Sequence, residues 1–153
     1  MEAKGNFYIE SQEDSLALET FSAFKILAIK LKSEDELRLA DLYLSKCYLN
    51  LRQDSLAELY ISSGFSKLNE KPDSLASAYG NLIKSQIEFR NGAYDSVLHY
   101  SYKSLSQYEA LGHVKGMLLN HLIIASSYFL VGIPDKAADY FNQGINIALQ
   151  NNE

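Results

Sequence analysis

Residues 124–145 read IASSYFLVGIPDKAADYFNQGI, and the pattern of this stretch returns along the chain at intervals of 40 residues. The recurrence is visible in six aligned columns: Leu42, Leu82 and Leu122; Ser45, Ser85 and Ala125; Leu49, Phe89 and Phe129; Arg52, Gly92 and Gly132; Ala17, Ala57, Val97 and Ala137; and Tyr60, Tyr100 and Tyr140. A fixed period of this length is the signature of a repeat protein, in which similar units stack on one another.

Each repeat is predicted to contain two helices, because apolar residues recur at helical rather than alternating spacing. The two prolines, Pro72 and Pro134, each stand just before a predicted helix start. The pattern predicts no strand. The predicted helices cover approximately residues 14–31, 33–51, 54–69, 73–90, 94–110, 115–131 and 135–150, preceded by a short N-terminal stub.

The helix starts carry residues that are typical of N-caps. Ser33 and Glu36 have the spacing of a capping box, in which hydroxyl and carboxylate each accept a hydrogen bond from a backbone N–H group. Asp73, Asp95 and Asp135 are N-cap candidates for the same reason.

This pattern resembles the tetratricopeptide repeat (TPR), which has a small residue within helix A, an aromatic near its end, a turn glycine and Ala-x-x-x-Phe in helix B. The copy that matches it best consists of Ile124, Ala125, Tyr128, Gly132, Ala137, Phe141, Gly144 and Ile145. The period of 40 also suits HEAT-type repeats, but the spacing from the turn to Ala-x-x-x-Phe favours the TPR. Repeats of this spacing, with the phrases at 103–105 and 111–112, are similar to those of bacterial signalling and transcription regulators.

The resemblance implies an all-α fold, a TPR-like right-handed solenoid of antiparallel helix pairs. We expect a single repeat domain over residues 1–153, with a partial repeat at 1–31 and full repeats at 33–69, 73–110 and 115–150. We also expect this chain to be a fragment of a longer protein. If Phe141 and Tyr128 are buried as the alignment predicts, truncating either should cost about 3–5 kcal/mol.

Composition excludes several functional classes. The 153 residues carry a net charge of −5, which disfavours nucleic-acid binding by this segment. No apolar run approaches the roughly 20 residues that span a bilayer, so no membrane contact is predicted. Cys47 is the only cysteine, which excludes an internal disulfide and a cysteine-based zinc site. A cytoplasmic location is slightly favoured, and an extracytoplasmic one stays open if the chain is a sensor fragment.

No catalytic or cofactor-binding arrangement is visible. The three histidines, His99, His113 and His121, include no pair at four-residue spacing, so no metal site is predicted. The sequence also lacks a phosphate-binding glycine loop. We therefore predict no enzyme activity and no cofactor.

The TPR resemblance implies that a partner binds the concave face formed by the first helix of each pair. The candidate groove residues are Leu39, Tyr43, Lys46, Asn50, Tyr79, Ile83, Gln86, Arg90, Leu119, Ile123, Ser126 and Leu130. Ile83, Ile123 and Ser126 depart from the Lys/Asn/Arg clamp of chaperone-binding TPRs. The apolar share instead favours an amphipathic helix or an extended apolar peptide. The alternative is that these apolar residues only pack on neighbouring helices.

The predicted helix 14–31 is apolar on more than one face, which is typical of a helix covered from more than one side. Its candidate self-association residues are Leu18, Phe21, Ile26 and Ile29. The alternative is that the N-terminal stub covers them.

Two functions follow from these observations. The first is a protein-interaction module that binds a peptide or protein partner in its groove. The second is a sensor or regulatory input domain of a longer bacterial signal-transduction or transcription regulator, acting through self-association.

Overall fold

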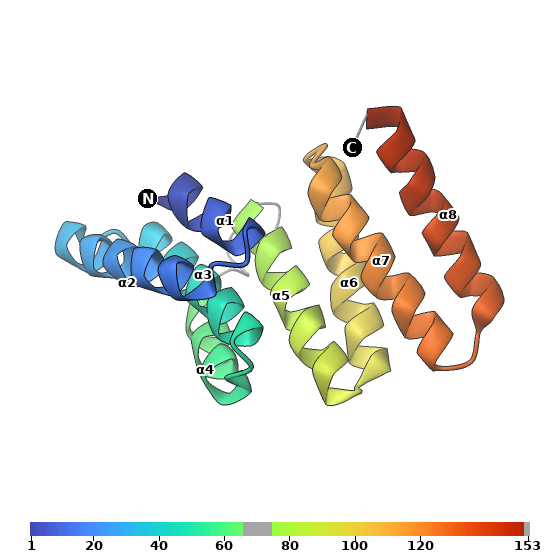
Figure 1. The fold of residues 1–153 in the computed structure, drawn as a ribbon, viewed down its shortest axis with the longest axis horizontal. Helices are drawn as coiled ribbons and strands as arrows, with labels where there is room; N and C mark the ends of the chain where they lie inside the picture. Colours follow the sequence, from blue (N-terminus) through green and yellow to red (C-terminus); the bar gives the residue numbers. More distant parts are fainter. Residues whose placement is uncertain (66–74, 152–153) are drawn as a thin grey trace. The chain divides into compact units, whose positions relative to one another are not determined.

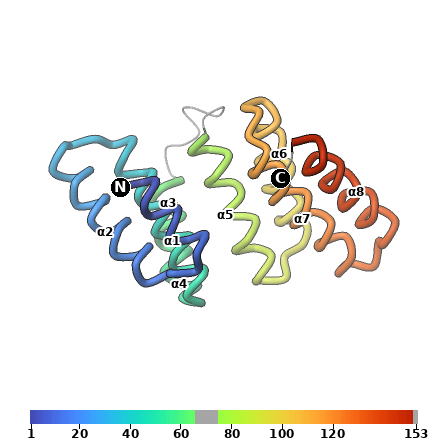
Figure 2. Tube along the Cα trace, turned by 45° about the horizontal axis from the view of Figure 1, so that its top comes forward, coloured from blue at the N-terminus to red at the C-terminus, as the bar shows by residue number. Residues whose placement is uncertain are grey.

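The computed structural model describes residues 1–65 and 75–151, which form helices joined by short turns with no strand among them (Figures 1 and 2). The helices are α1 (Glu2–Glu10), α2 (Asp14–Leu31), α3 (Glu34–Asn50), α4 (Asp54–Phe65), α5 (Leu75–Asn91), α6 (Tyr94–Ala110), α7 (Val114–Leu130) and α8 (Pro134–Asn151). The all-helical prediction is confirmed. The end of the predicted helix 54–69 and the start of 73–90 lie outside the described residues.

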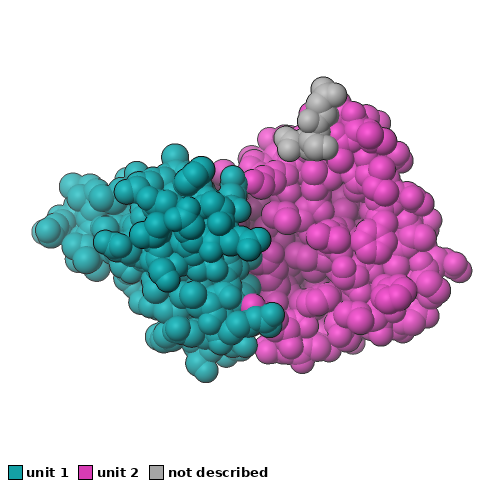
Figure 3. Space-filling view, in the orientation of Figure 1, with its two compact units in different colours: residues 1–70 teal, residues 71–153 magenta. Residues whose placement is uncertain are grey.

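The chain divides into two compact units, Met1–Glu70 and Lys71–Glu153 (Figure 3). In unit 1, α1 packs on α2, α2 packs on α3, and α3 packs on α4. In unit 2, α5 to α8 pack successively in the same way, and α5 also contacts α7. Each unit is thus built from antiparallel helix pairs. The single domain over residues 1–153 remains a prediction.

The turns between helices repeat one backbone geometry at 20-residue intervals. The residues with positive φ are Gln12, Lys32, Arg52, Gly92, Gly112 and Gly132, with values between 54° and 79°. In the last of these turns, the Gly132 N–H donates to the Phe129 carbonyl (3.1 Å) and the Ile133 N–H to the Tyr128 carbonyl (2.9 Å). The other five turns make the equivalent pair of bonds, which is a Schellman motif. The aligned column Arg52, Gly92 and Gly132, which corresponds to the turn position of the TPR pattern, lies in these turns.

The position that continues this series, Pro72, lies outside the described residues. Two 20-residue steps, each consisting of a helix and its turn, make up the 40-residue repeat.

The predicted capping of the helix starts is wrong in detail. The Ser33 side chain makes no capping hydrogen bond, so there is no capping box at α3. Ala93 stands at the N-cap of α6, while Asp95 and Asp135 lie inside the first turns of α6 and α8. The tight Schellman turns start each helix early, which places the carboxylates where they stabilise the positive end of the helix dipole. Asp73 lies outside the described residues.

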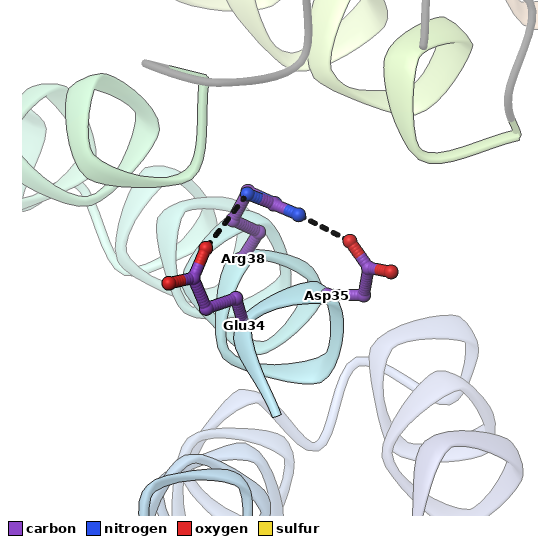
Figure 4. Close-up of polar contacts among 3 residues, drawn as sticks. All are labelled: Glu34, Asp35 and Arg38. Carbon is purple, nitrogen blue, oxygen red and sulfur yellow. Dashed lines mark hydrogen bonds and ion pairs between the residues drawn. The ribbon is translucent and has the colours of Figure 1, made fainter. Parts of the chain in front are cut away.

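The start of α3 shows how these acidic turns are stabilised (Figure 4). Glu34, Asp35 and Glu36 all lie in its first turn. The guanidinium of Arg38 pairs with Asp35 three residues back and approaches Glu34 four residues back, at 3.7 Å. Glu34 and Asp35 are exposed, so these pairs contribute only tenths of a kcal/mol.

The N-terminal stub is the helix α1, and it corresponds to the last turns of a helix A. Gly5 occupies the small-residue position 40 residues before Ser45. A Cβ at Gly5 would lie within 2.3–2.7 Å of the Phe21 ring, so glycine lets α1 close over that ring. Phe21 is completely buried as a result.

The residues at the two small-residue positions of the repeat are buried in every copy. Ser45, Ser85 and Ala125 from helices A and Ala17, Ala57, Val97 and Ala137 from helices B are all buried. In unit 2, one apolar cluster joins Leu105, Ile124, Tyr128 and Ala137 and a second joins Ala78, Leu82 and Tyr108, with Met117 packing against both. Close helix approach therefore depends on the repeat pattern.

The last helix pair departs from the predicted burial. Tyr128 is 8% exposed, as the alignment predicts, but Phe141 is 40% exposed. The equivalent residues Ile61 and Ser101 are buried. The expected cost of about 3–5 kcal/mol therefore applies to Tyr128 and not to Phe141.

Within the described residues, no helix is both long enough and apolar enough to span a membrane.

Candidate functional site

One of the four groove candidates on α3, Tyr43, is buried within unit 1. The Tyr43 ring stacks on Phe21 with centroids 4.4 Å apart, and its hydroxyl donates to Glu2 Oε1 at 2.5 Å. Asn6 Nδ2 donates to the same hydroxyl at 3.4 Å. Tyr43 is consequently buried beneath α1 and is not open to a partner.

The remaining α3 candidates are half-buried. Asn50 Nδ2 donates to Asp14 Oδ1 at 2.8 Å, which ties the end of α3 to the start of α2. Leu39 and Lys46 retain partial exposure. The α3 face thus offers a partner less surface than the alignment predicts.

The candidates in unit 2 lie on α5 and α7, which contact each other. Ile83 is completely buried and belongs to the core. The exposed members are Leu119 (37%) and Leu130 (52%). The half-buried members are Tyr79, Gln86, Arg90, Ile123 and Ser126. We define the inner face of unit 2 as these seven residues, and its exposed part is apolar.

The four N-terminal self-association candidates differ in how far they are exposed. Ile26 and Ile29 are more than half exposed, and Leu18 is half-buried. Phe21 leaves this set because α1 covers it. This covering is the alternative that the sequence left open for the N-terminal stub.

The sequence analysis missed a column of buried polar residues at one repeat position. Asp41, Asn81 and His121 are 40 residues apart, and each is at most 3% exposed. Asp41 Oδ1 pairs with Lys25 Nζ at 2.6 Å, and Ser63 Oγ donates to Asp41 Oδ2 at 2.6 Å. The 40-residue alignment holds the signal, since all three positions are polar in the middle of a helix A.

Asn81 belongs to a buried network that joins α5 and α6. Asn81 Nδ2 donates to Gln107 Oε1 at 2.9 Å, and Gln107 Nε2 donates to Ser77 Oγ at 2.9 Å. Between α6 and α7, Asn120 Nδ2 donates to Ser104 Oγ at 3.0 Å. Buried polar groups with partners of this kind fix the register of the helices.

His121 ends the column in a different environment. Its ring centroid lies 5.7 Å from that of Tyr140, and its buried Nδ1 has no hydrogen-bond partner among the described residues. Burial lowers the pKa of His121, while the charge of Glu109 opposes this shift. The neutral imidazole is therefore the favoured form.

His113 stands at the N-cap of α7 and caps that helix with its side chain. Its Nδ1 accepts a hydrogen bond from the Gly116 N–H at 3.0 Å. Its ring also lies against Tyr108, with centroids 5.0 Å apart.

Three tyrosines form a cluster across α6, α7 and α8. The hydroxyls of Tyr102 and Tyr128 are 2.8 Å apart, and Tyr128 and Tyr140 stack with centroids 5.8 Å apart. Burial, followed by hydrogen bonding from Tyr128, raises the pKa of Tyr102. The Tyr102 phenol therefore stays protonated, and the three side chains act as packing groups with hydrogen-bonding ends.

The cysteine is structural as well. Burial is the main cause that raises the pKa of Cys47 to about 12, and the charge of Asp14 adds to the effect. A thiol that stays protonated is a poor nucleophile. In residues 1–65 and 75–151, no group of three or more His, Cys, Asp or Glu residues is placed to hold a metal ion.

Comparison with known proteins identifies the fold. No family model and no curated protein matches the sequence. Among solved structures, the chain is similar to a Rap protein crystallised in complex with competence and sporulation factor, with a TM-score of 0.85 and 12% identity. The match covers 98% of this chain and 42% of that one, so this chain spans less than half the length of the Rap chain. The molecule has a TPR-like helical-repeat fold.

Proposed function

We propose that this chain is a TPR-type protein-interaction module that binds an apolar peptide or protein segment on the inner face of unit 2. The observation that carries the proposal is the fold, which is shared over 98% of the chain with a Rap protein crystallised with a bound factor. The inner face supports it, because Leu119 and Leu130 on α7 expose apolar surface, and α5, which contacts α7, adds the polar Gln86 and Arg90. Such a face suits an amphipathic helix or an extended apolar peptide.

The test is selection of binders from a library of random peptides, followed by affinity measurement on purified variants. We expect Leu130→Asp to weaken a selected peptide at least about tenfold, because a carboxylate on the face costs desolvation when an apolar segment covers it. Leu59→Asp is the matched control, since Leu59 on α4 is 62% exposed and lies outside the candidate groove. Circular dichroism of each variant checks that the fold is intact.

Equal weakening by Leu130→Asp and Leu59→Asp would remove the inner face from this proposal. Failure of the library to yield any peptide that binds would count against peptide recognition as a whole. Tyr43 is unsuitable as a position for this test, because it is buried under α1 and its loss would damage the fold.

The second candidate function is a regulatory input domain of a longer signal-transduction protein. It is favoured by the length comparison, because the similar Rap chain is more than twice as long as the part matched here. Sequencing the gene on both sides of this segment tests it. We expect an adjoining segment of kinase or DNA-binding type, and a reading frame confined to these 153 residues would contradict it.

A further inference from the structure

The turn between α5 and α6 contains Asn91 followed by Gly92, which is the only asparagine–glycine pair in the sequence. Asparagine is one of the chemically labile residues of proteins. Its side-chain amide is most open to attack by the main chain when glycine follows, because glycine has no Cβ to shield its backbone nitrogen. The other two glycine turns have Leu111 and Val131 before the glycine, so only the α5/α6 turn combines glycine with a reactive amide.

The reaction that this pair supports is deamidation through a cyclic imide. The backbone nitrogen of Gly92 attacks Cγ of Asn91, a new N–Cγ bond forms, and the bond from Cγ to Nδ2 breaks. The side-chain nitrogen leaves as ammonia, with the proton that the Gly92 nitrogen gives up. Water then opens the imide at either of its carbonyls. The product is aspartate, or isoaspartate, in which the main chain runs through the side-chain carboxyl carbon.

Both residues of the pair are accessible to water. Asn91 is the last residue of α5, and the Asn91 and Gly92 side of the turn is exposed. A Cβ at Gly92 would have no atom within 4 Å, so the turn is open around its glycine. Water can therefore reach an imide formed here and complete the reaction.

The closed turn opposes the first step of the reaction. The Gly92 N–H donates to the Phe89 carbonyl at 3.2 Å, and the Ala93 N–H donates to the Glu88 carbonyl at 3.1 Å. The first of these bonds holds the proton that the attacking nitrogen has to lose. Closing the imide ring also requires a ψ angle at Asn91 that differs from the helical value. Deamidation therefore needs the last turn of α5 to open.

An aromatic contact across the turn opposes this opening. The ring of Phe89, near the end of α5, meets the ring of Tyr94 at the start of α6 edge-on, with centroids 5.9 Å apart. Aromatic pairs of this geometry stabilise a fold beyond the area that they bury. The α7/α8 turn has Phe129 and Pro134 at the equivalent positions, so it lacks this pair of rings.

We propose that Asn91 is a site of spontaneous deamidation, at a rate set by opening of the α5/α6 turn. The product places a carboxylate at the C-terminal end of α5, where the helix dipole is negative. Isoaspartate also adds one carbon atom to the main chain within the Schellman motif, which disturbs the bonds donated by Gly92 and Ala93. The modification thus weakens the link between α5 and α6, and it does not depend on the proposed function.

The experiment is incubation of the purified full chain at slightly alkaline pH, with peptide mapping by mass spectrometry to follow deamidation at each asparagine. We expect Asn91 to be modified at a measurable rate in the folded chain. The rate should be at least about tenfold higher in the same chain unfolded by urea, because the reaction follows the population of the open turn.

Two phenylalanine variants test the control by the turn. Phe89→Ala should speed deamidation of Asn91 in the folded chain at least about threefold, because it removes the ring contact with Tyr94. Phe129→Ala is the matched control, since Phe129 holds the equivalent position in the α7/α8 turn. It should leave the rate at Asn91 unchanged. Far-ultraviolet circular dichroism confirms that both variants are folded.

A folded chain in which Asn91 stays unmodified overturns the proposal. Equal rates in the folded and the unfolded chain would show that the turn does not set the rate. So would a rate that Phe89→Ala leaves unchanged, or one that Phe89→Ala and Phe129→Ala raise equally. Peptide binding is measured on chain that has not been incubated, so a failure of the inner face is told apart from a failure of this site.

Discussion

At the residue scale, the six left-handed turns fall into two classes. Gly92, Gly112 and Gly132 use glycine, whereas Gln12, Lys32 and Arg52 place a side chain in a backbone conformation that L-residues disfavour. A non-glycine residue in this region costs about 1–2 kcal/mol. The non-glycine turns all lie in unit 1, so unit 1 carries a backbone cost that unit 2 avoids.

This difference predicts how substitutions at two of the turns change stability. Gly92→Ala should destabilise the chain by about 1 kcal/mol, because its φ is +72° and no atom within 4 Å offers a compensating contact. Arg52→Gly should be more stable than Arg52→Ala by up to about 1 kcal/mol, since both remove the side chain and only glycine relieves the backbone. Urea unfolding midpoints at constant slope measure both differences. A more stable Arg52→Ala would contradict the left-handed turn at this position.

His121 predicts a pH dependence of stability. Its pKa is lowered in the folded chain, so the folded state binds fewer protons than the unfolded state below the usual pKa of about 6.5. The stability contributed by neutral His121 is therefore present above about pH 6.5 and is lost as the pH falls through the lowered pKa of the folded state.

The check is urea unfolding of wild type and His121→Asn at neutral and mildly acidic pH. Asparagine stands at the equivalent position 81, so it is a residue this fold accepts there. We expect His121→Asn to lose less stability on acidification than wild type. The control is His99→Gln, because His99 is exposed. The same acid response in wild type and His121→Asn would show that His121 is not the group responsible.

At the element scale, glycine sets how closely α6 and α7 approach. A Cβ at Gly116 would lie 2.5 Å from the ring of Tyr108, which is itself only 2% exposed. Gly116→Ala should therefore destabilise the chain by about 1–3 kcal/mol. Gly144→Ala in α8 should stabilise it by about 0.5–1 kcal/mol, because its nearest contact is an ordinary 3.4 Å and alanine is the better helix former.

Both variants replace glycine by alanine within the α7/α8 hairpin. The difference between their free energies of unfolding therefore reports the close contact between Gly116 and Tyr108. Thermal and urea unfolding measure both. Gly116→Ala with wild-type stability would mean that α6 and α7 lie further apart in solution than described.

The sequence alone was sufficient to predict α2 to α8 within the described residues and the turns at Arg52, Gly92 and Gly132, because the 40-residue period repeats local signals. The predicted helices 14–31 and 94–110 coincide with α2 and α6. Capping was predicted less well, because the Schellman turns close through backbone groups that side-chain patterns do not report. Helix α1 was expected only as a stub, since half a helix A is too short to show the period.

The candidate site was harder to predict, because a repeat alignment assigns one environment to every copy. Tyr43 was placed in the groove, but α1 covers it in the first copy. Phe141 was expected in the core, but no described helix covers the last copy. The errors thus lie at the two ends of the repeat series, where a neighbour is short or absent from the described residues.

At the scale of the whole molecule, local stability should be lowest in the first and last helices. In α1, only Gly5 is buried, and in α8 only Ala137, whereas α3 and α5 each bury eight residues. In repeat proteins each element is stabilised by its immediate neighbours. Amide hydrogens of α1 and α8 should therefore exchange through openings of lower free energy than those of α3 and α5.

Hydrogen exchange read by mass spectrometry on one sample measures all of these helices together. The amides of α1 and α8 should exchange at similar rates, because each of these helices buries a single residue. Equal protection of α1, α3, α5 and α8 would contradict this order, since it would mean that the chain opens only as a whole.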